Sequence, residues 1–72
     1  MTQKTSLPVI WPDNMRPGIA AKYLGVSDSK LAKLRMEPNR HLGPRFIKAA
    51  GCIVYRRSDL DDWLESHLVE AA

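Results

Sequence analysis

Prolines and glycines divide this sequence into short segments, which limits it to short helices and short strands. Pro17 fits the first position of a helix, and Gly25 follows where a left-handed residue commonly ends one. Pro38 interrupts the next segment, and Gly51 lies between two runs rich in β-formers. The 72 residues make one domain at most, and such a domain buries only about 60% of the surface that its unfolded chain exposes. We therefore expect a thin core and little room for an enclosed active-site cavity.

Two short helices joined by a tight turn are predicted in the first half of the chain. The first covers residues 17–24. The second begins after Ser27, a natural N-cap, and is expected to end near Glu37, with Leu31 and Leu34 facing inward. This spacing matches a helix-turn-helix, in which the second helix enters the major groove of DNA. A plain αα-hairpin has the same local signature.

A β-hairpin and a third helix are predicted in the second half. Residues 45–49 and 52–56 are two runs of β-formers joined by Ala50 and Gly51, where Gly51 supplies a positive φ. The third helix is expected to begin with Ser58 as its cap. Its apolar stripe, expected in the core, consists of Leu60, Trp63, Leu64 and Leu68. The predicted fold class is α+β: a winged helix-turn-helix, with three helices and a two-stranded β-hairpin wing between helices 2 and 3.

Charge is distributed unevenly along the chain. Residues 1–57 hold all 11 Lys and Arg residues and three acidic residues, a formal charge of +8. Residues 58–72 hold five acidic residues and no Lys or Arg, a formal charge of −5. A basic body followed by an acidic helix suits a polyanionic partner that is met on one side only. The alternative is an ordinary solvated surface with chance clustering of charge.

The sequence also suggests how the chain is divided and where it functions. We expect an extended N-terminal arm over residues 1–15, a winged helix-turn-helix domain over residues 16–68 and a C-terminal tail over residues 69–72. Trp11, in the arm, can pack either on the body or on a neighbouring protomer. The single cysteine, Cys52, excludes an intramolecular disulfide and is typical of a reducing cytoplasm. The apolar stretch near the start is too short for a signal peptide or a membrane span, so no membrane partner is expected.

The candidate DNA contacts are polar and basic side chains on the second helix and on the wing. The helix offers Ser29, Lys30 and Lys33. The wing offers Arg45, Lys48, Arg56 and Arg57. Lysines on the helix can donate to guanine or to phosphate, and a basic ribbon can contact phosphates or the minor groove. The alternative for the hairpin is a charged edge that resists aggregation.

Enzymatic and metal chemistry are not expected, and neither is a cofactor. The single cysteine and the two histidines, His41 and His67, lack the spacing of a zinc site. His67, near the end of the third helix, is expected to interact with the negative helix terminus. Asp59, Asp61 and Asp62 fall in the first turns of the third helix, where the helix dipole favours acidic side chains. The sequence offers no nucleophile paired with a base and no glycine-rich phosphate loop.

Two sequence blocks resemble a known family. Residues 20–27, AAKYLGVS, and residues 54–64, VYRRSDLDDWL, are similar to the small MerR-like winged-helix proteins, which include excisionases of phages and mobile elements and AlpA-like regulators. The resemblance spans roughly residues 16–68. It implies DNA binding through the second helix and the wing without enzymatic activity, and it adds Ser27 to the helix contacts. Arg16 departs from the family, which often has a capping Ser or Thr at this position.

Within that family, excisionases bend attachment-site DNA and favour excision by an integrase, whereas the regulators act at promoters. We expect the excisionase role, because the sequence shows neither a ligand pocket nor a heptad repeat for a dimerising coiled coil. Cooperative self-association on double-stranded DNA is expected, through Val9, Ile10 and Trp11 of the arm and through the acidic helix. An integrase is a further expected partner. The alternatives are an AlpA-like transcriptional regulator and a protein-interaction module whose acidic helix docks a basic partner.

Overall fold

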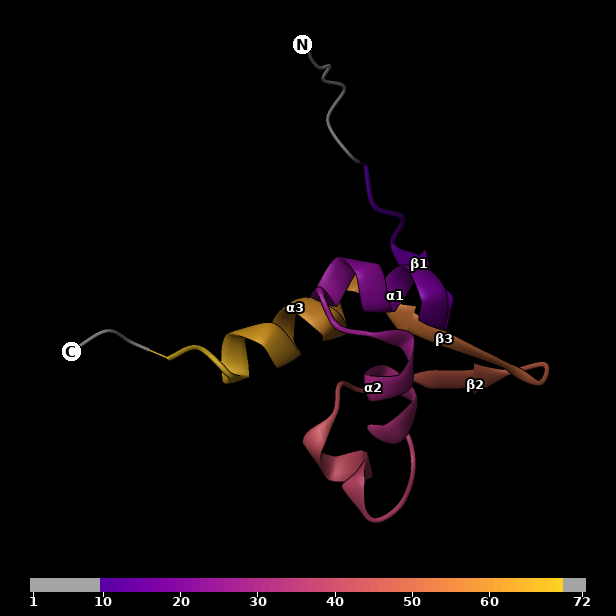
Figure 1. Ribbon diagram of the computed structural model, residues 1–72. Coiled ribbons are helices and arrows are strands. Elements are labelled where there is room, and N and C mark those ends of the chain that lie inside the picture. The colour runs from indigo at the N-terminus through magenta and orange to yellow at the C-terminus, as the bar shows by residue number, and fades with distance from the viewer. Residues whose placement is uncertain (1–9, 70–72) are drawn as a thin grey trace, which may run out of the picture.

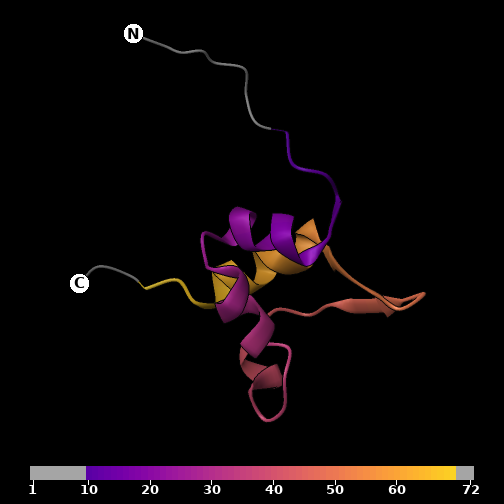
Figure 2. The ribbon, with the colours of Figure 1, turned by 45° about the vertical axis from the view of Figure 1, so that its right-hand side comes forward.

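The computed structural model describes residues 10–69, over which the chain forms three α-helices and a three-stranded antiparallel sheet (Figure 1). The elements, in chain order, are β1 (Asn14–Met15), α1 (Pro17–Leu24), α2 (Asp28–Lys33), the 3₁₀ helix η1 (Asn39–Leu42), β2 (Ile47–Ala49), β3 (Cys52–Arg56) and α3 (Arg57–Ser66). The predicted α+β class is confirmed, with a hairpin between the second and third α-helices. Figures 1 and 2 show this β2–β3 hairpin projecting away from the helices.

The sheet differs from the predicted two-stranded hairpin. β1 pairs antiparallel with β3, with Asn14 opposite Arg56 and Met15 opposite Tyr55, and the strand order is β1-β3-β2. The prediction of two strands was wrong because Asn14 had the character of a turn residue, and a strand of two residues shows no periodicity. Its formation depends on β3, which lies far along the chain. Residues that the sequence assigned to the arm therefore pair with the sheet.

A two-residue turn joins β2 to β3, as predicted. Ala49 lies opposite Cys52, and the intervening Ala50 and Gly51 have φ angles of 51° and 76°. Two positive φ angles are typical of a type I′ turn, whose twist matches that of the flanking strands. The positive φ at Gly51 is thus confirmed, whereas a left-handed alanine costs about 1 kcal/mol. β2 begins at Ile47 and is shorter than the predicted strand.

The turn between α1 and α2 follows the predicted capping chemistry. Gly25 ends α1 in the left-handed region, with φ 78°, and its N–H bonds back into the last turn. The side-chain oxygen of Ser27 accepts a hydrogen bond from the N–H of Lys30 at 3.0 Å. α2 then ends at Lys33, so the predicted end near Glu37 was wrong. After Lys33 the backbone continues in tighter i→i+3 turns.

The core is small and draws on every α-helix and on two strands. It consists of Met15, Ala20, Ala21, Leu31, Tyr55 and Leu60. The hydroxyl of the buried Tyr55 accepts a hydrogen bond from Nη1 of Arg35 at 3.1 Å, so its polar end is satisfied. The inward orientation predicted for Leu31 is confirmed, because this side chain is fully buried.

α3 corrects the sequence prediction at both ends. It begins at Arg57 rather than after a Ser58 cap, and it ends at Ser66. On its predicted apolar stripe Leu60 is fully buried, but Trp63 is only half-buried and lies outside the core cluster. The prediction of a continuous buried stripe was wrong, since the last two positions, Leu64 and Leu68, are 40% and 65% exposed. The rest of the domain covers mainly the first half of α3, where the buried residues Asp59 and Leu60 lie.

Candidate nucleic-acid interface

The predicted helix contacts all lie at the surface, on or beside α2. Ser29, Lys30 and Lys33 are exposed, and their spacing of three and four residues places them on one face. Leu31 points the other way, into the core. Ser27 is also exposed, and its oxygen caps α2, which leaves its O–H proton able to donate to a ligand. α2 therefore presents two ammonium groups and two hydroxyl groups to solvent.

An open groove of about 620 Å³ lies between η1 and β2. It is lined by Arg40, His41, Gly43, Pro44, Arg45, Phe46 and Lys48. Every lining residue with a formal charge is a cation, so the groove favours anions. Arg45 and Lys48, two of the predicted wing contacts, are exposed here. The structure thus brings half of the predicted wing contacts to one basic groove.

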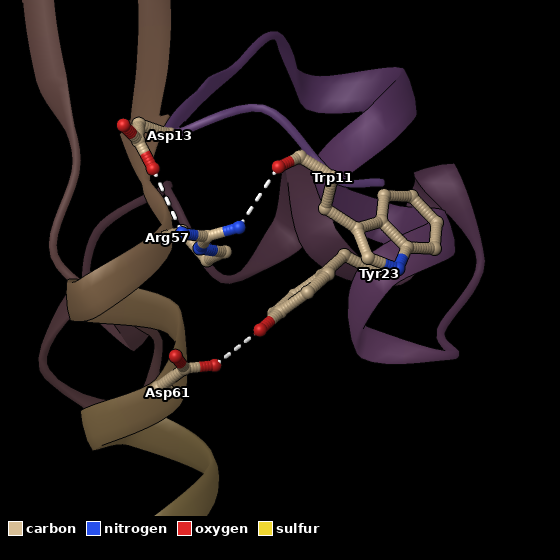
Figure 3. Close-up of polar contacts among 5 residues, drawn as sticks. All are labelled: Trp11, Asp13, Tyr23, Arg57 and Asp61. Carbon is tan, nitrogen blue, oxygen red and sulfur yellow. Dashed lines mark hydrogen bonds and ion pairs between the residues drawn. The ribbon is translucent and has the colours of Figure 1, made fainter. Parts of the chain in front are cut away.

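The other two predicted wing contacts are held by carboxylates. Nε of Arg56 donates to Oδ2 of Asp59 at 2.8 Å, and Asp59 is only 6% exposed. Arg57 lies in α3 rather than on the hairpin, and its guanidinium donates to the carbonyl of Trp11 and to Asp13, each at 2.9 Å (Figure 3). A phosphate would have to compete with these partners. DNA contact by either arginine stays a prediction.

The N-terminal segment packs on its own chain. The ring of Trp11 meets that of Tyr23 edge-on, with centroids 5.2 Å apart (Figure 3). The structure therefore places Trp11 on its own chain, one of the two positions expected for it, and a role between protomers stays a prediction. Ile10 is 87% exposed, and Val9, also expected to join protomers, lies outside the described residues.

A hydrogen bond joins α1 to α3 next to this contact. The hydroxyl of Tyr23 donates to Oδ1 of Asp61 (Figure 3). This bond raises the pKa of Tyr23, because the phenolate would lose it, and burial and the charge of Asp61 act in the same direction. Asp61 thus has a structural partner as well as a position near the start of α3.

The histidine of the last helical turn and the single cysteine lie apart from the basic groove. Nδ1 of His67 lies 2.9 Å from the carbonyl oxygen of Trp63 in the last turn of α3, which confirms its predicted contact with the helix terminus. Cys52 is a free, half-buried thiol at the start of β3. Within residues 10–69, no group of three His, Cys, Asp or Glu side chains is placed to hold a metal ion.

Arg40 was not among the contacts predicted from the sequence. It lies on η1, the 3₁₀ helix between α2 and β2. Neighbouring Arg40 and His41 give this stretch a basic character, which is a weak signal in a loop. Their place beside β2 depends on how the chain folds back after α2, which no local pattern reveals.

Comparison of the chain with models of protein families and with curated proteins finds no match. Within the part of the chain that the structure describes, none of the helices has the length and apolar character needed to cross a membrane. Because the comparisons find no match, support for a function comes from the geometry and charge of this chain and from the resemblance of its two sequence blocks.

Proposed function

We propose that this protein binds double-stranded DNA as a winged helix-turn-helix domain, with α2 in the major groove and the β2–β3 hairpin as the wing. The observation that carries the proposal is the exposed face of Ser29, Lys30 and Lys33, opposite the buried Leu31. In helix-turn-helix proteins, residues at the start of the second helix reach base edges. The capped turn between α1 and α2 supports this arrangement, since it fixes where α2 begins.

The exposed face of α2 and the wing have different tasks in this proposal. Ser29, Lys30 and Lys33 read base edges, where serine and lysine can donate hydrogen bonds. Arg45 and Lys48 bind phosphates or enter the minor groove, which fixes the position of the domain on the duplex. With Arg45 and Lys48 as two phosphate contacts per protomer, the logarithm of the binding constant falls with the logarithm of salt concentration at a slope of about −1.8, from about 0.9 per contact.

Sequence selection from a random duplex pool tests this division. Once a preferred site is known, affinity for it and for random duplex is measured by fluorescence anisotropy in wild-type protein and in Lys33→Gln. The substitution is expected to reduce the preference for the selected site. Lys22→Gln is the matched control, because Lys22 is an exposed lysine on α1.

Two results would contradict the proposal. If Lys33→Gln keeps the full preference for the selected site, α2 is not the recognition helix. If the wild-type protein fails to bind any duplex even at low salt, the protein-interaction module becomes the better description.

In the cell, the proposed role is that of an excisionase, which bends attachment-site DNA so that an integrase excises a mobile element. The resemblance of AAKYLGVS and VYRRSDLDDWL to the excisionase and AlpA-like family supports this role. The exposed apolar residues Ile10, Leu64 and Leu68 are available for protein contacts between copies on DNA or with the integrase. Excision in a recombination assay only when this protein accompanies the integrase is the expected result. Binding at a promoter without any effect on excision would favour the AlpA-like regulator.

A further inference from the structure

Arg40 is an exposed arginine whose guanidinium is held in place by three neighbours. Its Nε donates to the carbonyl of Arg35 at 3.2 Å, and its Nη1 lies 3.6 Å from Oε2 of Glu37. Its guanidinium carbon is 5.5 Å from the centre of the Phe46 ring, a cation–π distance. Because these contacts restrict its rotamers, Arg40 loses less conformational entropy than a free arginine when it binds an anion.

The segment that carries Arg40 is itself fastened to the body. A Cβ at Gly43 would lie 2.7 Å from Cβ of Leu34, so the backbone of Gly43 runs directly against the residue that follows α2. The indole Nε1 of Trp63 donates to the carbonyl of Leu42 at 2.9 Å. η1 is thus attached to the end of α2 on one side and to α3 on the other.

The groove beside η1 brings Arg40 together with Arg45 and Lys48. Two smaller hollows on the described surface have mixed charge: each includes two carboxylates, Asp13 and Asp61 in one and Asp59 and Asp62 in the other. The basic groove also contains the half-buried ring of Phe46. Cations beside an apolar ring suit a phosphodiester backbone, in which charged oxygens alternate with apolar sugar faces.

We infer that this groove binds the phosphodiester backbone of the duplex, as a contact separate from the reading of bases by α2. The inference rests on the proposed function, because the backbone belongs to the DNA that α2 reads. Figures 1 and 2 show the segment that holds η1 and the hairpin as two projections in different directions. The residues that line the groove include Arg40 and His41 of η1 and Lys48 of β2. A phosphate that enters the groove meets Arg40, Arg45 and Lys48. Glu37 competes less than the partners of Arg56 and Arg57, because its contact with Arg40 is 3.6 Å long, against 2.8 Å and 2.9 Å for theirs.

Arg40→Gln tests the groove, with Arg16→Gln as the matched control. Arg16 is an exposed arginine that follows β1, at the opposite edge of the sheet from β2. Affinity for the selected site and for random duplex is measured by fluorescence anisotropy across salt concentrations. Arg40→Gln is expected to reduce the magnitude of the log–log slope by about 0.9 and the affinity roughly eightfold at 0.1 M salt. Both duplexes should be affected equally, because a backbone contact carries no sequence information. Arg16→Gln should leave the slope unchanged.

Two further variants distinguish the effect of losing a positive charge from the effect of losing the fold. Arg40→Lys keeps the positive charge and is expected to keep the salt slope. Lys48→Gln removes a second groove cation without altering η1, so it tests the groove even if circular dichroism shows that Arg40→Gln is unfolded.

The possible outcomes distinguish the groove from DNA binding itself. If wild-type protein binds duplex and Lys33→Gln reduces its preference for the selected site, but Arg40→Gln and Lys48→Gln behave like Arg16→Gln, the backbone contact of the groove is overturned. The proposed wing contact of Lys48 is then overturned with it, whereas the reading of bases by α2 stands. If wild-type protein binds no duplex, both the proposed function and the backbone contact of the groove are overturned.

Discussion

The guanidinium of Arg57 donates a hydrogen bond of 2.9 Å to the carbonyl oxygen of Trp11, 46 residues away in the sequence (Figure 3). The same guanidinium pairs with Asp13 at 2.9 Å, and the backbone N–H of Arg57 donates to the carbonyl of Asp13 at 2.7 Å. One residue at the start of α3 thus fastens the segment that leads into β1. This attachment keeps β1 against β3, where Met15 joins the core.

Arg57→Gln is therefore expected to destabilise the domain. Charge-assisted hydrogen bonds contribute about 1.5–3 kcal/mol, and because the Arg57 side chain is 41% exposed we expect a loss of only about 1 kcal/mol. Urea unfolding followed by circular dichroism measures the change. Arg16→Gln, at an exposed arginine, should change stability by less than about 0.5 kcal/mol. Equal stability of the two variants would show that the attachment contributes nothing.

Leu60→Ala should be more damaging than Trp63→Ala, although tryptophan is the larger residue. Leu60 is fully buried, and truncating such a side chain costs about 2–5 kcal/mol. Trp63 is half-buried at the edge of the domain, where its indole contacts Leu42. Thermal unfolding of both variants ranks the two losses. A lower melting temperature for Trp63→Ala would mean that the second half of α3 closes the core.

Ala50→Gly is expected to stabilise the domain. Ala50 has φ 51°, a left-handed conformation that glycine adopts without steric strain, so the gain should be about 1 kcal/mol. Ala49→Gly, one residue earlier within β2, is the control and should destabilise. Denaturant unfolding gives both values. A loss of stability in Ala50→Gly would argue against the two-residue turn.

Tyr23 should titrate at higher pH than a free tyrosine, whose pKa is 10.0. The hydrogen bond to Asp61 favours the neutral phenol, so its contribution to stability is complete below pH 10 and is lost as the pH rises through the raised pKa. NMR of the tyrosine ring follows this titration, and Asp61→Asn should lower the pKa of Tyr23. An unchanged pKa in Asp61→Asn would contradict the contact.

The elements that the sequence predicted well are those set by neighbouring residues. Gly25, Ser27 and Gly51 act through local backbone conformation or local hydrogen bonds, so their roles follow from residue type and spacing. β1 could not be predicted in the same way, because Met15 is a strand residue only through its partner Tyr55. Contacts between distant segments leave no periodic pattern in so short an element.

The same distinction applies to the candidate site. Exposure of Lys30 and Lys33 follows from helical spacing around the buried Leu31. The structural attachment of Arg57 and the position of Arg40 beside the hairpin both depend on tertiary contacts. A basic residue in the sequence therefore indicated charge, but its partner could not be assigned without the fold.

NMR mapping of a duplex titration tests most directly whether α2 and the hairpin form the DNA-binding surface. Amide resonances of residues 29–33 and 45–48 are expected to shift as duplex is added at low salt, and those of residues 62–66 on α3 should remain nearly unchanged. Carboxylates on α3 repel phosphate, so this helix is expected to face away from DNA. Shifts confined to α3, or none at all up to excess duplex, would contradict DNA binding through α2 and the hairpin.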